Sequence, residues 1–479
     1  MRRAKNILLL TLLVCVTVSA RAAETNSLVW QADRDRVSAD IHSEALWPLL
    51  EDIAHLTGWQ IFVEPDIHQT ASVKFQDLPA GEALRKLLGN LNYALVPETN
   101  GPQQLYVFTT TMHNATRRVA AAPAKAAPQK HVANELLVKL KPGADIDAVA
   151  KALGAKVVGR NDKLGIYRLQ FGDAAATDAA LAQLKNNSDV QSVDYNYIYD
   201  PPPKPQPVAN APVGPPELTL NNSTTGDPCD PIVGLIDTRM QSLGNQLDQF
   251  VMKPIAIGDA ASTSGSTQTQ SIGNPVAVFT PQQVSGYAGA VPTHATAMAE
   301  TILRAVSQQG SSSSVRILPV DVYGASDTTT SWNVALGVQA AVDGGATVLN
   351  LSLGGTTDSA ILDNIIQQAL ARGVVIFAAA GNQPVSTPTY PAAIPGVNAV
   401  TALGQPGQLA SYANFGSFVE MALPGSSVIY IGTQAYIVQG TSPATAYASG
   451  VAAGTKSVNC LPWAQIQSAM AAKFPVPQQ

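Results

Sequence analysis

The sequence is poor in the residues from which metal and nucleic-acid sites are built. It has three cysteines and six histidines among 479 residues, and only 13% of the residues are charged. The net charge of −5 gives no reason to expect nucleic acid as a partner. No group of aspartates shows the spacing of an EF-hand loop, so the sequence predicts no metal or other cofactor and leaves calcium undecided.

Long hydrophobic runs are also scarce, and the one that exists lies at the N-terminus. "MRRAK" is basic, "NILLLTLLVCVTV" is apolar, and "SARAAE" offers small residues for cleavage near Ala22 or Ala23. The run is too short to span a bilayer comfortably, so a removed signal peptide over residues 1–23 is predicted rather than a membrane anchor. Cys15 lies within this predicted signal peptide and would be removed with it. In an exported chain the remaining pair, Cys229 and Cys460, suggests a disulfide; the alternatives are two unrelated thiols or a cysteine that pairs between chains.

Apolar residues make up 46% of the chain, which is ample for a core, and the length suggests roughly three domains. Two segments rich in Pro and Ala, residues 113–132 ("RRVAAAPAKAAPQK") and residues 201–226 ("PPPKPQPVANAPVGPP"), are predicted to be semi-rigid linkers. They separate domains over residues 24–112, 133–200 and 227–479.

The first domain alternates helical stripes with strand-like runs. Leu46, Leu49, Leu50, Ile53 and Leu56 recur at helical spacing, "WQIFV" and "ASVKF" are strand-like, and a second leucine stripe runs from Leu84 to Leu91. This small α+β pattern resembles the short N-terminal domain of secretins and TonB-dependent receptors. The resemblance implies an envelope partner, and a periplasmic, outer-membrane-associated or secreted location.

The second domain shows the order strand, helix, two strands, helix, strand. "ELLVKL" and "LGIYRLQF" are strand-like, "DIDAVAKALG" and "TDAALAQLKNN" are helical, and "VQSVDYNYIY" is the last strand. Many ferredoxin-like domains share this order. The pattern resembles the inhibitory propeptide of subtilases, which implies that the protein's own propeptide is one of its partners.

The third domain alternates strands that are almost wholly apolar with amphipathic helices. "DPIVGLID", "VRILPVDVY", "ATVLNLSLGG" and "VVIFAAAGN" are the strands. Such runs predict an α/β fold, a parallel sheet with helices on both faces, in which ligands bind beyond the carboxyl ends of the strands.

Ser442 and His294 each have an ordinary interpretation. Ser442 in "VQGTSPATAYASG" serves equally well as a helix cap, and a histidine at a helix start is commonly a capping or surface residue. However, His294 is the only histidine of the third domain, so a serine nucleophile there would have no other imidazole base in its domain. His42, His55 and His68 of the first domain show no metal-ligand spacing.

The ordered set of motifs decides between these interpretations. "GLIDT" at Asp237, "THATAMAETI" at His294, "NLSLGG", "AAAGN" at Asn382 and "GTSPATAYASG" at Ser442 together resemble the subtilase family of serine peptidases. The resemblance implies a subtilisin-like fold and peptide or protein substrates. It also implies that Asp237 orients His294, that His294 is the base of nucleophile Ser442, and that Asn382 is the side-chain oxyanion donor.

The same resemblance implies that "SLGG", with Ser352, Leu353 and Gly354, pairs with the substrate backbone, although an ordinary strand end would look the same. Several positions depart from the family pattern, namely Arg239, Ala295, Pro443, Ala446 and Tyr447. Arg239 keeps a second hypothesis open, in which the domain is a catalytically weak binding module of an envelope complex. The sequence does not indicate the preferred substrate residue.

Overall fold

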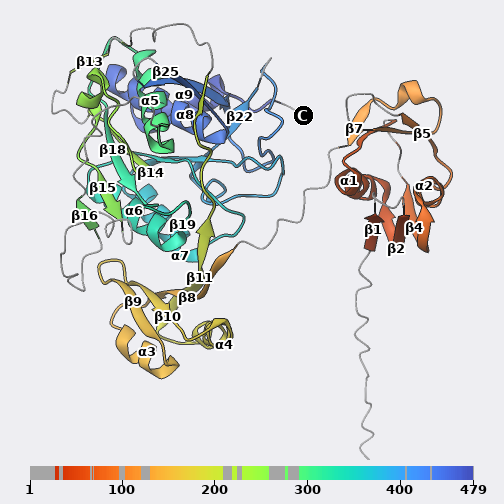
Figure 1. The fold of residues 1–479 in the computed structure, drawn as a ribbon, viewed down its shortest axis with the longest axis horizontal. Coiled ribbons are helices and arrows are strands. Elements are labelled where there is room, and N and C mark those ends of the chain that lie inside the picture. Colours follow the sequence, from red (N-terminus) through yellow and green to blue (C-terminus); the bar gives the residue numbers. More distant parts are fainter. Residues whose placement is uncertain are drawn as a thin grey trace, which may run out of the picture. The chain divides into compact units, whose positions relative to one another are not determined.

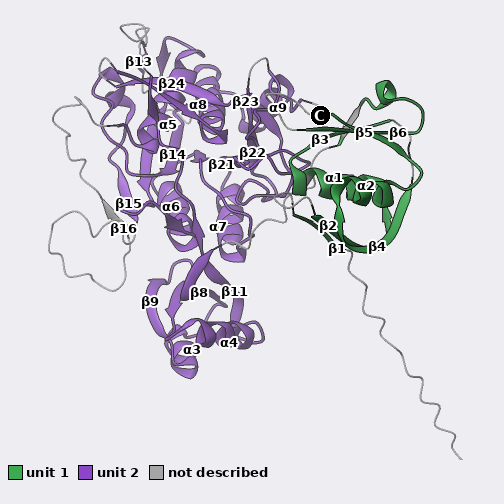
Figure 2. Ribbon diagram, turned by 45° about the vertical axis from the view of Figure 1, so that its right-hand side comes forward, with its two compact units in different colours: residues 1–124 green, residues 125–479 purple. Residues whose placement is uncertain are grey.

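The computed structural model divides the chain into two compact units, residues 1–124 and 125–479 (Figure 2). The described residues are 27–31, 36–64, 67, 69–96, 103–119, 130–208, 218, 220–223, 229–257, 276–278, 291–404, 407–431 and 434–477. The predicted signal peptide, residues 1–23, lies outside them. Within these ranges, no helix is both long enough and apolar enough to cross a membrane.

The first unit packs two helices against two small sheets, with strand orders β1-β2-β4 and β5-β6-β3-β7. Leu49, Leu50 and Ile53 are fully buried, as their helical spacing predicts, and Gly58 ends the helix with a left-handed φ of 72°. Strand β7 pairs with β3 although it lies within the predicted linker 113–132. The elements are β1 (Ser27–Gln31), β2 (Arg36–Ala45), α1 (Leu46–Thr57), β3 (Gln60–Val63), β4 (Thr70–Pro79), α2 (Ala80–Leu88), β5 (Asn92–Val96), β6 (Gln104–Phe108), η1 (Met112–Asn114) and β7 (Arg117–Val119).

The second unit begins with a small domain, residues 130–200, in which two helices pack on one sheet. Its helices start where aspartate side chains accept backbone N–H bonds: Asp145 from Asp147, and Asp173 from Ala176. The elements follow the predicted order: β8 (His131–Leu140), α3 (Ile146–Leu153), β9 (Lys156–Asn161), β10 (Ile166–Gln170), α4 (Ala174–Leu184) and β11 (Val190–Tyr199).

The described residues from 229 to 477 form a large domain around a sheet of order β16-β15-β18-β14-β20-β21-β22-β23. All neighbouring strands of this sheet are parallel except β15 and β16. The elements are β14 (Ile232–Asp237), η2 (Gln246–Phe250), β15 (Ile255–Ile257), β16 (Val276–Val278), α5 (His294–Ser307), β17 (Ser312–Ser313), β18 (Arg316–Asp321), β19 (Thr329–Thr330), α6 (Ser331–Asp343), β20 (Val348–Leu351), α7 (Ala360–Ala371), β21 (Val375–Ala379), β22 (Asn398–Leu403), β23 (Met421–Pro424), β24 (Ser426–Ile431), β25 (Gln434–Gln439), α8 (Thr441–Asn459) and α9 (Trp463–Lys473).

Helices cover both faces of this sheet (Figure 1). The core on one face contains residues of α5, α8 and α9, and the core on the other contains residues of α6 and α7. The predicted α/β fold is therefore confirmed. Because the strands run parallel, their carboxyl ends meet along one edge, where loops bring distant residues together.

The small domain is joined to the large one through β11, which also pairs with β19 (Figure 1). Two side chains of β11 meet helix N-termini of the large domain. Asp194 accepts hydrogen bonds from Ser359 Oγ at 3.1 Å and Ile361 N at 3.0 Å at the start of α7. Asn196 Oδ1 accepts from Trp332 N at 3.2 Å at the start of α6. Free N–H groups of both helices thus find partners in the small domain.

The Pro-rich segment 201–226 is not simply a spacer. Two short strands interrupt it: β12 (Gln206–Pro207), which pairs with β25, and β13 (Asn221–Asn222), which pairs with β17. Its composition favours an extended backbone, and an extended backbone can add to an open sheet edge as well as span a gap.

Candidate active site

Asp237 is the last residue of β14, at the carboxyl edge of the sheet, and it is 2% exposed. Its Oδ1 accepts the backbone N–H of Thr238 at 2.6 Å. The Thr238 hydroxyl in turn accepts the N–H of Ala295 at 3.0 Å, which ties the strand end to the first turn of α5. The "DT" pair of the sequence motif therefore positions both the carboxylate and the helix that follows.

His294 is the first residue of α5, and its ring meets Asp237. The distances from Nδ1 are 2.9 Å to Oδ1 and 2.8 Å to Oδ2, and the histidine is 3% exposed. A carboxylate only accepts hydrogen bonds, so in the neutral ring Nδ1 carries the proton and Nε2 keeps its lone pair. Nε2 is buried and has no hydrogen-bond partner within the described part of the chain. It is therefore available to accept a proton.

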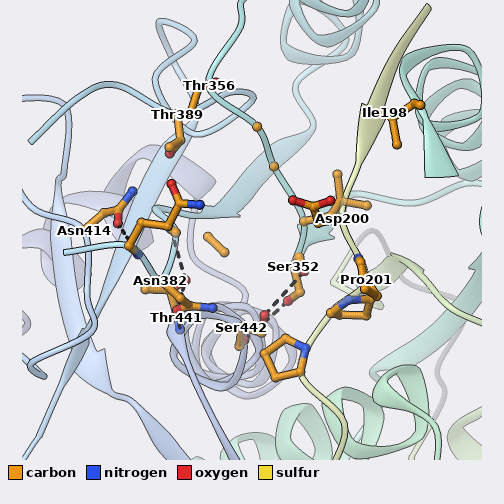
Figure 3. A pocket seen from close by; sticks show the side chains of 18 of the residues that line it. Ile198, Asp200, Pro201, Ser352, Thr356, Asn382, Thr389, Asn414, Thr441 and Ser442 are labelled. Atoms are coloured by element: carbon orange, nitrogen blue, oxygen red, sulfur yellow. Dashed lines mark hydrogen bonds between the residues drawn. The ribbon is translucent and has the colours of Figure 1, made fainter. Parts of the chain in front are cut away.

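Ser442 lies in the first turn of α8, directly after the turn at Gly440, whose φ is 144°. Its Oγ donates to the carbonyl oxygen of Ser352 at 3.4 Å (Figure 3). A bond from Ser442 to His294 Nε2 is thus not formed in this state. Catalytic hydrogen bonds are commonly long or misaligned without substrate, so this geometry does not exclude a catalytic pair.

The helices that carry His294 and Ser442 pack very closely, α5 against α8. A Cβ at Gly450 would lie 2.7 Å from the Cβ of Ala305, so only glycine fits this contact. The close approach fixes the spacing of the two helices. The structure therefore brings all three predicted triad elements to one edge of the sheet, although only Asp237 and His294 are hydrogen-bonded.

Asn382 follows β21 and turns its side chain toward the start of α8. Its Oδ1 accepts the backbone N–H of Thr441 at 2.8 Å and the Thr441 hydroxyl at 3.1 Å. Because a backbone N–H can only donate, the accepting atom must be Oδ1, which leaves the donor Nδ2 on the other side of the amide. Figure 3 shows Asn382 beside Ser442.

Ser352, Leu353 and Gly354 follow β20 and line a cavity of about 410 Å³ together with Asn382 and Ser442. Asp200, Pro201, Pro202 and Pro203 of the preceding segment also line this cavity. Three predicted site segments that are far apart in the sequence therefore share one space.

A buried polar network behind Ser442 was not predicted from the sequence. Asn350 on β20 donates from Nδ2 to Ser352 Oγ at 2.9 Å and accepts at Oδ1 from Ser449 Oγ at 3.1 Å. Ser352 Oγ in turn lies 3.3 Å from the carbonyl oxygen of Ser442. The network joins α8 to the sheet. The only signal in the sequence is a polar residue inside the apolar strand "ATVLNLSLGG".

The positive charge of Arg239 acts on the buried carboxyl of Asp321. Burial raises the pKa of Asp321 above its usual value, while the backbone N–H groups of Gly324 and Tyr323 and the positive charge of Arg239 oppose this shift. Arg239 is not among the residues that line the cavity.

The other departures lie on α5 and α8. Pro443 occupies the first turn of α8, where proline costs no helical hydrogen bond. Ala295 is fully buried in the first turn of α5. Tyr447 reaches from α8 to Gln308, just beyond α5, through a hydroxyl-to-amide hydrogen bond.

Cys229 and Cys460 form a disulfide, with their Cα atoms 5.1 Å apart. It links the start of the large domain to the end of α8. Within the described ranges, no group of three or more His, Cys, Asp or Glu side chains is arranged to hold a metal ion.

Comparisons with known proteins follow the same domain order. Residues 230–474 match the model of the subtilase family, and residues 117–196 match the model of the fervidolysin N-terminal prodomain. The thermophilic serine proteinase of Bacillus sp. (strain AK1) is 28% identical over 332 residues, which cover 67% of this chain and 78% of that protein. M-protease of Shouchella clausii (strain KSM-K16) is 33% identical over 177 residues, which cover 36% of this chain and 46% of that protein.

Among solved structures, fervidolysin from Fervidobacterium pennivorans, described as a keratinolytic enzyme related to subtilisin, has a similar fold. The TM-score is 0.52 at 19% identity, and the likeness covers 74% of this chain and 63% of that chain. At this identity the likeness concerns the fold alone. The chain spans less than two thirds of the length of fervidolysin and less than half of that of M-protease.

Proposed function

Because the chain belongs to the subtilase family of serine peptidases, we propose that it is an exported endopeptidase in which Ser442 is the nucleophile, His294 the base and Asp237 the orienting acid. The resemblances to subtilases and to a subtilase propeptide are confirmed by the matches over residues 230–474 and 117–196. The buried pair of Asp237 and His294 carries the proposal, because in the neutral ring it leaves the lone pair to Nε2, at the edge of the sheet where Ser442 begins its helix.

The reaction is an acyl transfer in two steps. Ser442 Oγ turns away from Ser352 O toward Nε2, gives its proton to Nε2 and attacks the substrate carbonyl carbon. The C–N bond then breaks, and the leaving nitrogen takes that proton from His294. In the second step, water gives a proton to His294 and attacks the acyl-enzyme. The bond to Ser442 Oγ breaks, Oγ takes the proton back, and the carboxylic acid product is released. Asp237 stays ionised throughout and stabilises the imidazolium cation.

Two kinds of donor support the negative charge that develops on the carbonyl oxygen. Asn382 Nδ2 is oriented by the bonds that its Oδ1 accepts from Thr441. The N-terminus of α8 adds free backbone N–H groups and the positive end of its dipole. Both are fixed before substrate arrives, which is the arrangement that stabilises a transition state most effectively.

Substrate would bind as an extended chain along Ser352, Leu353 and Gly354, which lie at the cavity wall. A Cβ at Gly354 would lie 2.9 Å from the carbonyl oxygen of Tyr390, so the wall is already close-packed on its other side. A side chain at position 354 would therefore push this segment away from Tyr390.

The small domain would act as an inhibitory propeptide. It contacts the large domain through β11, whose Asp194 and Asn196 meet the starts of α7 and α6, and the residues after β11 line the cavity. The chain would therefore be made as a latent zymogen.

The first unit would localise the enzyme by binding a partner. Its pattern resembles the short domain of secretins and TonB-dependent receptors, and we propose an envelope partner for it, at the periplasm, the outer membrane or the cell exterior. The Cys229–Cys460 disulfide is consistent with an oxidising compartment.

Covalent labelling by a small fluorophosphonate, together with hydrolysis of casein, tests the function. Mature enzyme, freed of the small domain and of the segment after it that lines the cavity, should be labelled. Ser442→Ala and His294→Ala in the same form should lose nearly all labelling and hydrolysis. Ser326→Ala, a serine exposed in a turn, is the matched control and should behave as wild type. Labelling that persists in Ser442→Ala would contradict the assignment. A folded protein without labelling or hydrolysis would favour the alternative, a binding module with a subtilase fold.

A further inference from the structure

The residues that follow the small domain cross the candidate active site as one strap, defined here as residues 200–208. Both ends of the strap are anchored to the large domain. Before it, Ile198 and Tyr199 pair with Thr330 and Thr329 of β19. At its far end, Gln206 and Pro207 of β12 pair with Ile437 and Tyr436 of β25. Strand β25 leads through Gly440 directly to Ser442.

The upstream anchor is a buried aromatic side chain. Tyr199 is 1% exposed and belongs to the same core as Val322 and Trp332 of the large domain. The hydroxyl of Tyr323 donates to the carbonyl oxygen of Asp200 at 3.4 Å, one residue further along. The strap therefore enters the cleft from a fixed point.

The downstream anchor is a short backbone ladder. The N–H of Val208 donates to the carbonyl oxygen of Ala435 at 2.9 Å, and Gln434 Nε2 donates to the carbonyl oxygen of Val208 at 3.3 Å. In an antiparallel pair, alternate N–H groups face the partner strand. The N–H groups of Gln206 and Lys204 therefore face β25 in the same phase as that of Val208.

The prolines of "PPPKPQPV" fit this alternation. Pro203, Pro205 and Pro207 fall at the positions whose N–H would point away from β25, so their missing donors cost the ladder nothing. From Pro203 to Val208 the non-proline residues are Lys204, Gln206 and Val208, which are the positions whose N–H groups face β25 in the register of β12. The strap is thus suited to occupy this edge of β25.

The strap passes over the nucleophile at its proline triplet. The triplet, Pro201 to Pro203, precedes the residues of the strap that pair with β25. The same three prolines line the cavity that Ser442 lines. Figure 3 shows Ile198, Asp200 and Pro201 along one side of this cavity and Asn382 and Asn414 along the other, with Ser442 between them.

A proline at this place is a poor leaving group. Cleavage requires His294 to hand its proton to the nitrogen of the residue after the broken bond. In proline this nitrogen carries the ring carbon Cδ where other residues carry hydrogen, so the ring fills the space through which the imidazole must approach. The bonds from Asp200 to Pro203 all have proline on the leaving side, so each is protected.

We propose that residues 200–208 are a proline-protected strap, which occupies the edge of β25 as a binding site for extended peptide on the leaving-group side and which Ser442 cannot cut in place. The proposal rests on the function proposed above. It implies that this edge binds the leaving-side portion of substrates once the strap is displaced. It also implies that separating the small domain upstream of Pro201 leaves the enzyme blocked.

Proline replacement in the full-length chain tests the protection. The triple variant Pro201→Ala, Pro202→Ala, Pro203→Ala should cut itself between residues 200 and 204, as read by mass spectrometry of the new termini. The variant Pro205→Ala, Pro207→Ala is the matched control and should stay intact from 200 to 208, as wild type should. Adding Ser442→Ala to the triple variant should abolish the cut. Ser442-dependent cleavage of wild type within 200–208, or a triple variant that hydrolyses casein yet keeps this segment intact, would overturn the proposal.

Hydrogen exchange tests occupancy without catalysis, in full-length Ser442→Ala. The amides of Gln206, Val208, Ala435 and Ile437 should exchange slowly. Val208→Pro removes an N–H that faces β25 and should speed exchange at Ala435 and Ile437, whereas Pro207→Val adds an N–H that faces away and should not. Fast exchange at Gln206 and Val208, or no effect of Val208→Pro, would overturn the strap even if peptidase activity were absent. Absent labelling and hydrolysis together with slow exchange would instead contradict only the proposed peptidase function.

Discussion

Gly159 on β9 faces Trp332 on α6 so closely that a Cβ at position 159 would lie 2.7 Å from Cζ2 of the indole. Trp332 is 3% exposed. The guanidinium of Arg168 lies over the same indole, with its Cζ 5.9 Å from the ring centroid. One tryptophan of the large domain is thus inserted against the sheet of the small domain.

Gly159→Ala should therefore weaken the docking of the small domain. Overpacking of this kind costs about 1–3 kcal/mol, and each 1.4 kcal/mol corresponds to about a tenfold change in the docked-to-undocked ratio. Fluorophosphonate labelling of the uncut chain should rise accordingly. Gly172→Ala is the control, because a Cβ there meets nothing within 4 Å. Equal labelling of the two variants would count against a close Gly159–Trp332 contact.

Asn382→Asp should lower kcat by about 10²- to 10³-fold with little change in KM, which is the cost of losing one oxyanion donor. The aspartate keeps an oxygen that accepts the N–H of Thr441, now 2.8 Å from Oδ1, so the start of α8 stays anchored. Steady-state kinetics on a peptide substrate would measure the effect. If Asn382→Asp kept its activity while Asn382→Leu lost it, Asn382 would act through Thr441 and not as a donor.

The sequence was sufficient to predict the parallel central sheet. Near-continuous apolar strands, such as "VVIFAAAGN", identify buried parallel strands because both of their faces are covered. Asp237, His294 and Asn382 each follow such a strand or begin a helix, so their neighbourhood could be predicted from the order of motifs. Their hydrogen bonds, including the one from Ser442 to Ser352, could not.

Contacts between distant segments left almost no trace in the sequence. Gly159 fits against Trp332 only because two domains meet there, and a glycine in a strand can equally mark a bulge or a tight bend. The strand at Gln206 was missed because its neighbouring prolines suppress strand propensity, and only the register with β25 shows that they face outward. Such pairings depend on which edges meet, which local composition does not encode.

Removal of the Cys229–Cys460 disulfide should destabilise the large domain. The bridge closes a loop of 231 residues, for which chain-entropy models give about 5 kcal/mol. The double variant Cys229→Ala, Cys460→Ala should unfold at a clearly lower denaturant concentration than the oxidised wild type. Reduced wild type is the control and should shift by a similar amount. Two alkylatable thiols in protein isolated under non-reducing conditions would contradict the bridge.

The docking of the small domain should depend on pH through Asp194. Burial between the domains raises the pKa of this carboxyl above its usual 3.8, hydrogen bonds from the N–H of Ile361 and the hydroxyl of Ser359 oppose the shift, and the charge of Asp358 adds to it. A carboxyl whose pKa is raised on docking binds a proton more tightly in the docked state. Its contribution to the free energy of docking is therefore fully favourable below the pKa that the group has in the undocked chain. That contribution is lost as the pH rises through the docked pKa.

In uncut wild type, undocking of the small domain should therefore become more favourable as the pH rises from about 3.8 through the raised pKa of Asp194. Above that pKa the docking equilibrium should no longer change with pH through this group. We would compare fluorophosphonate labelling rates of wild type and Asp194→Asn across this range. Both proteins contain His294, so the effect of its protonation on the labelling rate cancels in the ratio of the two rates. The ratio of wild type to Asp194→Asn should climb with pH, because only wild type must bury a carboxylate at the start of α7. A ratio that stays flat or falls would show that Asp194 is not the group that couples docking to pH.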